Sequence, residues 1–419
     1  MRRASFLNGL TAITTGGLLI RIAYVLAFSD HLHIGLDTTW YRLVSQTVAS
    51  GDGFIDPEKA YSHGVSVATA YRPPLYPFFL AAVDKTVGHS LQTFQLAGCV
   101  MGAVTIVLIG FLGRRVAGDT VGLCAAALAA VYPIFLAVDS AVMSETLYVP
   151  LAAGCVLGLY RAMERPTVPR WTLVGVLAGL AILTRGDGVI LLAVVVVPAA
   201  LSRSLVKPRR PGLALVPIIV AGLVVTPWVL RNQEQLGTPT VATLQTGTAL
   251  AGVYCPDTYS GELLGSWSFP CTQRPNQADI SEVALNDELQ RDGLDYLRDH
   301  PGHLLVVVPV RILRQWGLYD PTGEAKFEAI ESRNYRWQML SWIAYLPVAA
   351  LAGYGLVLLR RQQVLLLPMV AMIVAVTVTA ALIYGQQRLR VSVEPVLLVA
   401  AAVGIVHISD RVRGVRRLR

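Results

Sequence analysis

The residues of this chain best suited to catalysis or ligand binding are acidic residues and arginines that lie beside long apolar runs. Asp37 lies just beyond the first such run, within GLDTTWY at 35–41, and Glu145 stands at the start of the fourth. Arginine takes similar positions at Arg72, Arg185, Arg231, Arg388 and Arg390. A carboxylate can take a proton from a hydroxyl, and guanidinium groups bind phosphate through paired hydrogen bonds. This combination suits a reaction that deprotonates a hydroxyl and binds a phosphate.

The composition indicates a membrane protein. Hydrophobic residues make up 54% of the chain and charged residues only 15%, whereas soluble domains carry about a quarter charged residues. The mean hydropathy is +0.54. The net charge of +8 comes from Lys and Arg in the gaps between apolar runs, which is typical of membrane proteins and gives no reason to expect nucleic-acid binding.

Apolar runs of the length that crosses a bilayer, about 20 residues, recur along the chain. They lie at about 7–29, 92–113, 119–138, 146–162, 172–184, 189–202, 212–228, 337–359, 364–384 and 394–409. We therefore expect an all-α polytopic protein with about ten spanning helices. Basic residues in alternate gaps and at the C-terminus place both ends of the chain in the cytoplasm.

The runs and gaps divide the chain into three parts. Residues 1–228 form an N-terminal transmembrane core that includes a first outward loop at 30–90, and residues 337–419 form the last helices and a basic tail. Between them, 229–336 is an outward region. Its apolar stretch at 303–319 is interrupted by two arginines, so we expect a helix on the membrane surface there and not a span.

The five cysteines divide into two groups. Cys99, Cys124 and Cys155 lie within apolar runs and are expected to act as small hydrophobes. Cys255 and Cys271 share one outward loop, so we expect a disulfide between them, with two free thiols as the alternative. A zinc site is not expected, because two Cys without a nearby His leave the coordination incomplete.

Several motifs together resemble one family. They are GLDTTWY at 35–41, YRPPLYP at 71–77, SETLYVPLAAG at 144–154, LAILTRGDG at 180–188, TPWVLRN at 226–232 and YGQQRLRVSVEPVLLVAA at 384–401. In order and placement they resemble the glycosyltransferases of the GT-C fold that use polyprenyl-phosphate sugars, among them protein O-mannosyltransferases and aminoarabinose transferases. The resemblance implies a GT-C fold, a lipid-phosphate sugar donor and a site on the outer face of the membrane.

The resemblance also implies roles for the acids. Asp37 is expected to be the general base, with capping of the following helix as the alternative. Glu145 is expected to orient the sugar or acceptor, or else to lie in the headgroup region. Tyr41 is expected to contact the substrate, although aromatic residues at membrane interfaces are also common without a ligand.

Arginines of membrane proteins usually lie on the cytoplasmic side, whereas these arginines fall at helix ends expected to face outward. We expect Arg72, Arg185, Arg231, Arg388 and Arg390 to bind the donor phosphate; contact with bulk lipid phosphates is the alternative. Arg388 and Arg390 are favoured most, because residues two apart on an extended segment point the same way. Glu394 is then expected to brace one of these arginines.

No metal ligand is predicted. Family members often carry a second acid beside the first, but Thr38 or Thr39 stands there in this chain. Asp30, His31 and His33 offer zinc-binding side chain types, yet a His-x-His pair in a loop is more often exposed to solvent. No cofactor follows from the residues, and a divalent cation stays an open alternative.

Together these observations predict a glycosyltransferase of the plasma (inner) membrane. Its partners would be a polyprenyl-phosphate-linked sugar, an extracytoplasmic acceptor (a cell-envelope glycan, a lipid or a protein) and membrane lipids. A lipid or sugar transporter or flippase is the alternative. Transporters place charges near the membrane centre in broken helices, and only the LTRGDG stretch offers such a break. A receptor or scaffold would not explain acids and arginines spread over several loops.

Overall fold

The computed structural model describes residues 2–28, 34–202, 211–275 and 279–414. This part of the chain is helical apart from turns, loops and one isolated antiparallel bridge between Ile55 and Ala68. The elements, with η for a 3-10 or π helix, are α1 Arg2–Phe28, α2 Leu36–Ser50, α3 Pro57–His63, α4 Leu75–Thr86, α5 Leu91–Ala117, α6 Asp119–Val131, α7 Pro133–Ser140, α8 Glu145–Glu164, α9 Val168–Thr184, α10 Gly188–Ile190, η2 Leu191–Val196, α11 Val197–Leu201, η3 Pro211–Ala214, α12 Val216–Leu236, α13 Thr246–Val253, α14 Pro256–Tyr259, η4 Pro270–Thr272, α15 Glu282–Asp299, η6 Pro301–His303, α16 Leu304–Gln315, α17 Pro321–Ile330, α18 Tyr335–Arg361, α19 Leu367–Leu382, α20 Gln387–Arg390 and α21 Glu394–Val412.

The predicted apolar runs coincide with helices, which confirms the all-α membrane class. Within the described ranges, six helices are long and apolar enough to cross a membrane: α1, α5, α8, α12, α18 and α21. The pair α6 and α7 also qualifies as one span with a bend of 56°. Three shorter apolar helices lie at Val168–Thr184, Gly188–Leu201 and Leu367–Leu382. Whether all of these segments cross the bilayer stays a prediction.

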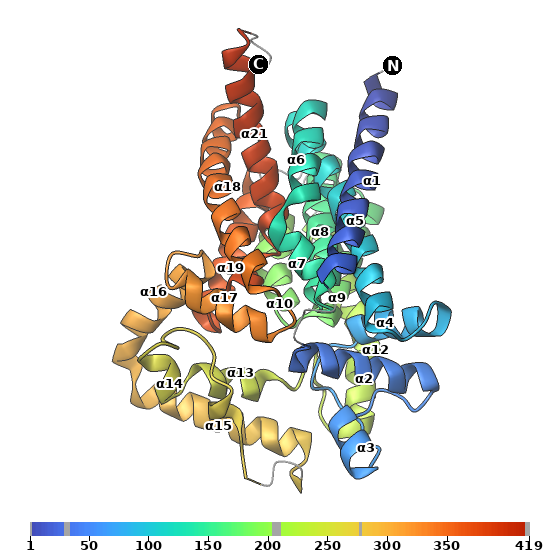
Figure 1. The fold of residues 1–419 in the computed structure, drawn as a ribbon, viewed down its shortest axis with the longest axis vertical. Coiled ribbons are helices and arrows are strands. Elements are labelled where there is room, and N and C mark those ends of the chain that lie inside the picture. The colour runs from blue at the N-terminus through green and yellow to red at the C-terminus, as the bar shows by residue number, and fades with distance from the viewer. Residues whose placement is uncertain (1, 29–33, 203–210, 276–278, 415–419) are drawn as a thin grey trace.

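The long helices run side by side, and both described ends of the chain lie at the same end of this bundle (Figure 1). The helices of the two polar regions, α2 to α4 and α13 to α17, gather at the opposite end (Figure 1). This arrangement agrees with the expectation that both termini lie on one side of the membrane and both long loops on the other. The largest hydrophobic core lies within the bundle and includes residues 396–403 of α21.

The bend between α6 and α7 is held by a buried arginine of α1. Pro133 has no backbone N–H, so it cannot donate to the carbonyl of Ala129 four residues earlier. Arg21 donates instead, from Nη2 to Ala129 O over 3.1 Å and from Nη1 to Ala130 O over 3.0 Å. Its Nε bonds Asp139 in α7 at 2.7 Å. Arg21 thus joins both halves of the broken helix, directly before the residues that lead into α8.

The polar region between α12 and α18 contains the predicted disulfide. Cys255 and Cys271 are bonded, which confirms the pairing, and Cys99, Cys124 and Cys155 are free. The apolar stretch expected at 303–319 forms α16, whose 12 residues fall short of the about 20 that a span needs. Its placement on the membrane surface stays a prediction.

Candidate active site

Asp37 lies in the first turn of α2, at the end of the bundle where the polar regions gather. The start of this helix is fixed from two sides. The backbone N–H of Gly35 donates to Ser332 Oγ over 2.8 Å, and Thr38 Oγ1 donates to the carbonyl of Ala141 over 2.8 Å. Gly35 occupies the capping position, and no side chain caps the helix. The alternative that Asp37 serves as the cap is therefore wrong, because the carboxylate points elsewhere.

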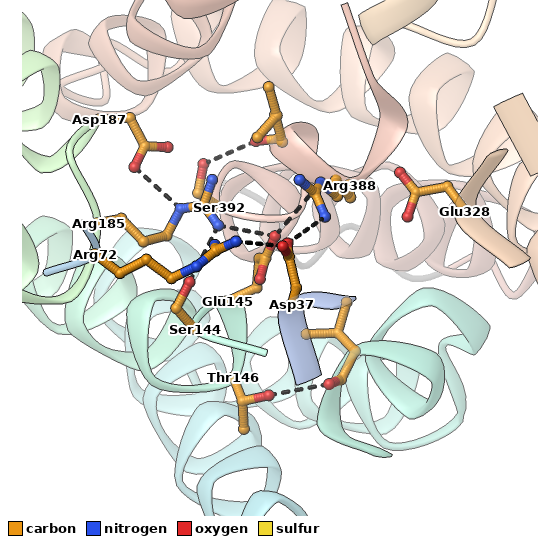
Figure 2. A network of polar contacts seen from close by, with 12 residues as sticks. Asp37, Arg72, Ser144, Glu145, Thr146, Arg185, Asp187, Glu328, Arg388 and Ser392 are labelled. Atoms are coloured by element: carbon orange, nitrogen blue, oxygen red, sulfur yellow. Dashed lines mark hydrogen bonds and ion pairs between the residues drawn. The ribbon is translucent and has the colours of Figure 1, made fainter. Parts of the chain in front are cut away.

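The carboxylate of Asp37 binds two arginines that are distant in sequence. Arg72 donates from Nη2 to Oδ1, and Arg388 donates from Nη1 to Oδ2 over 3.4 Å (Figure 2). Arg72 comes from the loop before α4, and Arg388 from the short helix α20 before the last span. The Asp37 side chain keeps only 15% of its surface exposed.

Glu145, at the start of α8, is the second acid of this network. Arg185 binds its Oε1 from Nη1 at 2.8 Å, and Nε of Arg388 lies 3.9 Å from the same atom. The Glu145 side chain is 2% exposed, so its charge depends on these cations. Arg388 therefore connects the two acids, and the structure brings Asp37, Arg72, Glu145, Arg185 and Arg388 together as expected (Figure 2).

Arg185 lies at the break between α9 and α10, where the RGDG sequence interrupts the helix. Its Nε binds Asp187 at 3.0 Å, and its Nη1 lies 3.4 Å from Ser144 Oγ. Asp187 thereby fixes the guanidinium that faces Glu145. Sequence reasoning did not single out Asp187, although its position two residues after Arg185 in a helix break was a usable signal.

The arginines keep Asp37 ionised. Burial by itself raises the pKa of a carboxyl, but the guanidinium groups of Arg72 and Arg388 lower the pKa of Asp37 below its usual value. Burial likewise lowers the pKa of an arginine, but the charge of Asp37 together with the nearby Tyr41 and Tyr71 raises the pKa of Arg72 above its usual value. The negative charges of Glu145 and Asp37 contribute in the same way to the raised pKa of Arg388. At neutral pH the cluster consists of charged groups held in a nearly dry site.

Aromatic rings surround the guanidinium of Arg72. Its centre lies 5.1 Å from the ring of Tyr41, 5.5 Å from Trp40 and 5.5 Å from Tyr71. Such cation–π contacts hold an arginine in place. Tyr41 is buried and packs edge-on against Tyr76 at a centroid distance of 5.0 Å. Tyr41 thus borders the charged cluster, and a direct contact with substrate stays a prediction.

Arg390 does not point into this cluster, which corrects the expectation that it works beside Arg388. The expectation assumed an extended segment, whereas Gln387–Arg390 is a helical turn. Residues two apart on a helix point to nearly opposite sides. Arg390 binds Glu394 at 2.7 Å and lies over the ring of Tyr345, and both charged side chains are fully buried. The expectation that Glu394 braces an arginine is confirmed.

Arg231 also lies outside the network around Asp37. It donates to the carbonyls of Thr69 and Phe54, each over 2.7 Å, and its guanidinium lies 4.9 Å from the ring of Trp228. These bonds tie α12 to the first polar loop. They give Arg231 a place in holding the loop that carries Arg72, and its contact with a phosphate stays a prediction.

The described side chains do not offer a metal site. No group of three or more His, Cys, Asp or Glu residues among them could hold an ion. Both oxygens of Asp37 face arginines, and a threonine stands at each of the next two positions, so the donor set does not fit a divalent cation. The zinc alternative at Asp30, His31 and His33 lies outside the described residues.

Comparison with known proteins finds a family model and several similar structures. Residues 71–230 match the family model described as dolichyl-phosphate-mannose-protein mannosyltransferase. The structure is similar to the oligosaccharyltransferase AglB from Archaeoglobus fulgidus in complex with an inhibitory peptide and a dolichol-phosphate. The TM-score is 0.57 at 14% identity, with 98% of this chain and 51% of that chain covered. The chain has the GT-C fold. The family resemblance expected from the motifs is thereby confirmed.

Two further structures are similar to this chain. AglB from the same organism in complex with Zn and sulfate matches with a TM-score of 0.55 at 14% identity, covering 97% of this chain and 50% of that chain. ArnT from Cupriavidus metallidurans bound to undecaprenyl phosphate gives a TM-score of 0.42 at 15% identity, covering 97% and 80%. This chain spans about half the length of the AglB chains it matches. Comparison with curated proteins gives no match.

Three residues near the cluster were not found from the sequence. Ser332 bonds the start of α2, Arg333 is buried next to it, and the carboxyl of Glu331 has a pKa raised by burial and by the nearby charge of Asp37. All three lie in the loop between α17 and α18. This loop has no apolar run directly before it, so charge placement alone gave no signal. Its proximity to Asp37 depends on tertiary contacts.

Proposed function

We propose that this GT-C protein is a membrane glycosyltransferase that moves a sugar from a polyprenyl-phosphate donor to an extracytoplasmic acceptor. The acceptor would be a cell-envelope glycan, a lipid or a protein, and the site would face outward from the plasma membrane. The observation that carries the proposal is the placement of Asp37 between Arg72 and Arg388 in a buried site. A proton acceptor and phosphate-binding groups are what sugar transfer from a lipid phosphate requires.

The reaction begins with exchange of partners around Asp37. The phosphate of the donor competes for the guanidinium groups of Arg72 and Arg388, which bind phosphate oxygens in a two-pronged geometry. Asp37 then loses part of the positive charge that lowers its pKa, so its basicity rises when the donor is bound. A base that strengthens only with donor in place would suppress reaction with water.

The transfer step follows from these positions. A hydroxyl of the acceptor gives its proton to a carboxylate oxygen of Asp37 as its own oxygen forms a bond to the anomeric carbon of the sugar. The bond from that carbon to the phosphate oxygen breaks, and its electron pair stays on the phosphate. The charge that develops on the leaving phosphate is stabilised by Arg388 and Arg72.

Glu145 and Asp187 act as positioning residues. Glu145 contacts both Arg185 and Arg388, and Asp187 holds Arg185 from the other side. Two arginines are thereby fixed at one end of the bundle before any ligand binds, and such preorganisation lowers the cost of binding an anion. AglB, the related GT-C structure, holds a dolichol-phosphate. A lipid phosphate of that chemistry is the donor proposed here.

The test uses purified full-length protein with a radiolabelled polyprenyl-phosphate sugar and an envelope extract as the acceptor source. We expect the label to leave the lipid and appear in a polar or larger product. Movement of intact labelled lipid across proteoliposomes, with no product formed, would instead support the flippase alternative.

A further inference from the structure

The loop between α17 and α18 forms one side of the charged cluster. Ser332 Oγ accepts from the Gly35 N–H at 2.8 Å and donates to Thr38 Oγ1 at 2.9 Å, so it binds the helix turn that carries Asp37. Ser332 adopts a φ of 61°, which is uncommon for a residue with a side chain. Backbone strain of this kind persists where the surrounding contacts enforce it, often at functional sites.

The next residue, Arg333, is buried with unused hydrogen-bonding capacity. It is 3% exposed, and its Nη1 binds Glu328. Its Nε and Nη2 have no hydrogen-bond partner among the residues that the structure describes. A buried guanidinium with unpaired N–H groups is unfavourable, because those groups have lost water and gained no acceptor. An acceptor that reaches these two nitrogens would remove the penalty.

Arg333 lies beside the charged cluster, because the neighbouring Ser332 bonds the helix turn that carries Asp37. Burial lowers the pKa of Arg333 to about 10, and Glu145, Arg388, Arg185 and Asp37 are the charges that act on it. Glu328, its ion-pair partner, lies on the Arg388 side of the network in Figure 2. Within the described part of the chain, Nε of Arg388 and Nε of Arg72 likewise lack hydrogen-bond partners. The unpaired N–H groups of Arg72 and Arg388 therefore belong to residues that bind Asp37, and those of Arg333 belong to the loop beside them.

We propose that Arg333 binds the phosphate of the polyprenyl-phosphate donor together with Arg388 and Arg72. This inference rests on the proposed function. The free Nε and Nη2 of Arg333 form one edge of the guanidinium and can bind two phosphate oxygens while Nη1 stays on Glu328. The donor is a phosphodiester with one negative charge, and the released lipid phosphate carries up to two. Two further N–H groups are therefore most useful as the bond between sugar and phosphate breaks and negative charge develops on the phosphate.

A purely structural role for Arg333 predicts something different. If the residue only braces the loop through its pair with Glu328, then loss of either partner harms the site in the same way. If Arg333 binds phosphate, loss of Glu328 removes a competing anion and leaves the binding residue in place. Loss of Arg333 then weakens lipid-phosphate binding, whereas loss of Glu328 does not.

The experiment measures binding of a short-chain polyprenyl phosphate to the purified full chain in detergent by calorimetry. The corresponding polyprenol and inorganic phosphate serve as probes that separate lipid phosphate from lipid or phosphate alone. We expect Arg333→Gln to weaken lipid-phosphate binding by at least about tenfold, the size typical for a lost charge-assisted hydrogen bond. Glu328→Gln should bind as well as wild type or better. Arg336→Gln, at an exposed position three residues on, is the matched control and should change nothing.

The outcomes separate the inference from the proposed function. Wild-type binding of the lipid phosphate with equal binding by Arg333→Gln overturns the role of Arg333 only. Equal losses in Arg333→Gln and Glu328→Gln overturn it as well, in favour of bracing. Absence of lipid-phosphate binding in the wild type overturns the proposed function and this inference with it. If Arg333→Gln fails to fold, the double variant Glu328→Gln, Arg333→Gln leaves no unpaired charge, and normal binding by it overturns the inference.

Discussion

Arg388 binds Asp37 at 3.4 Å although 351 residues separate them in the chain. The same guanidinium lies 3.9 Å from Glu145. One arginine before the last span thus connects the acid of the first polar loop with the acid that opens α8. Changes at this residue should therefore affect both the proposed base and the proposed phosphate contact.

Arg388→Lys is predicted to lower sugar transfer by tenfold or more. Lysine keeps the charge but cannot bind two phosphate oxygens in the planar geometry of a guanidinium, nor contact both acids at once. Both kcat and donor affinity should fall, whereas the acceptor KM stays near the wild-type value. Arg298→Lys, in the exposed part of α15, is the control. Normal donor affinity in Arg388→Lys would rule out the phosphate contact.

Arg390, by contrast, is predicted to matter for stability. Arg390→Met leaves Glu394 charged, fully buried and without its cation, which typically costs about 3–5 kcal/mol. Thermal unfolding in detergent should show a large drop. The double variant Arg390→Met, Glu394→Gln should regain much of it, because no unpaired charge is then buried and the bond from Tyr132 can persist. If the single variant Arg390→Met folds normally but binds the sugar donor more weakly, Arg390 has a role in binding after all.

The pH dependence follows from the lowered pKa of Asp37. A base with a pKa below its usual value of about 3.9 is already deprotonated at pH 5 to 8, so kcat/KM should show no acid-side loss there. Arg388→Gln removes a positive charge and should raise the pKa, so that kcat/KM begins to fall on the acid side at a higher pH. kcat reports the complex with the donor, in which the pKa of Asp37 is expected to be higher. The decrease of kcat on the acid side should therefore begin at a higher pH than the decrease of kcat/KM. An acid limb near pH 6 that does not move in Arg388→Gln would speak against Asp37 as its origin.

The Arg21–Asp139 pair is predicted to hold the bent helix α6–α7 in place. Arg21→Met removes the cation of a buried pair and the donors to two carbonyls, with an expected loss of about 3–5 kcal/mol. Asp139→Asn removes only the negative charge and should lower the stability less than Arg21→Met does. Unfolding measurements on both variants and on the double variant give the coupling between the two residues. Additive losses would mean that the pair contributes nothing as a pair.

The disulfide makes a separate prediction for the polar region between α12 and α18. Mass spectrometry of non-reduced peptides should find Cys255 linked to Cys271. Cys271→Ser should lower the stability of this region by about 3 kcal/mol, the size expected for a closed loop of about 15 residues. Cys124→Ser, at a free half-buried cysteine, is the control. Alkylation of both cysteines without reductant would contradict the pairing.

Much of the architecture could be predicted from the chain because a bilayer demands long apolar runs with basic gaps. The same reasoning found Asp37, Arg72, Glu145, Arg185 and Arg388, because a charge at an outward helix end needs a reason. The structure then brought these five residues together.

Other parts of the site could not be found in this way. The short segment before α21 has no periodicity that distinguishes an extended segment from a helical turn. The predicted direction of the Arg390 side chain was therefore wrong. The position of Arg333 depends on the hydrogen bond between its neighbour Ser332 and Gly35. Ser332 and Gly35 are 297 residues apart in the chain. Contacts at such separations depend on how the helices pack, which local sequence does not report.

The most direct test of the account is sugar transfer by Asp37→Asn. Asparagine keeps the shape of the side chain but cannot accept the proton, and loss of a general base typically costs 100-fold or more in rate. We predict this loss of turnover in a variant that still folds and that binds polyprenyl phosphate undiminished. Asp52→Asn, at an exposed acid just after α2, should change nothing. An Asp37→Asn protein that keeps more than about a tenth of the wild-type rate would contradict the account.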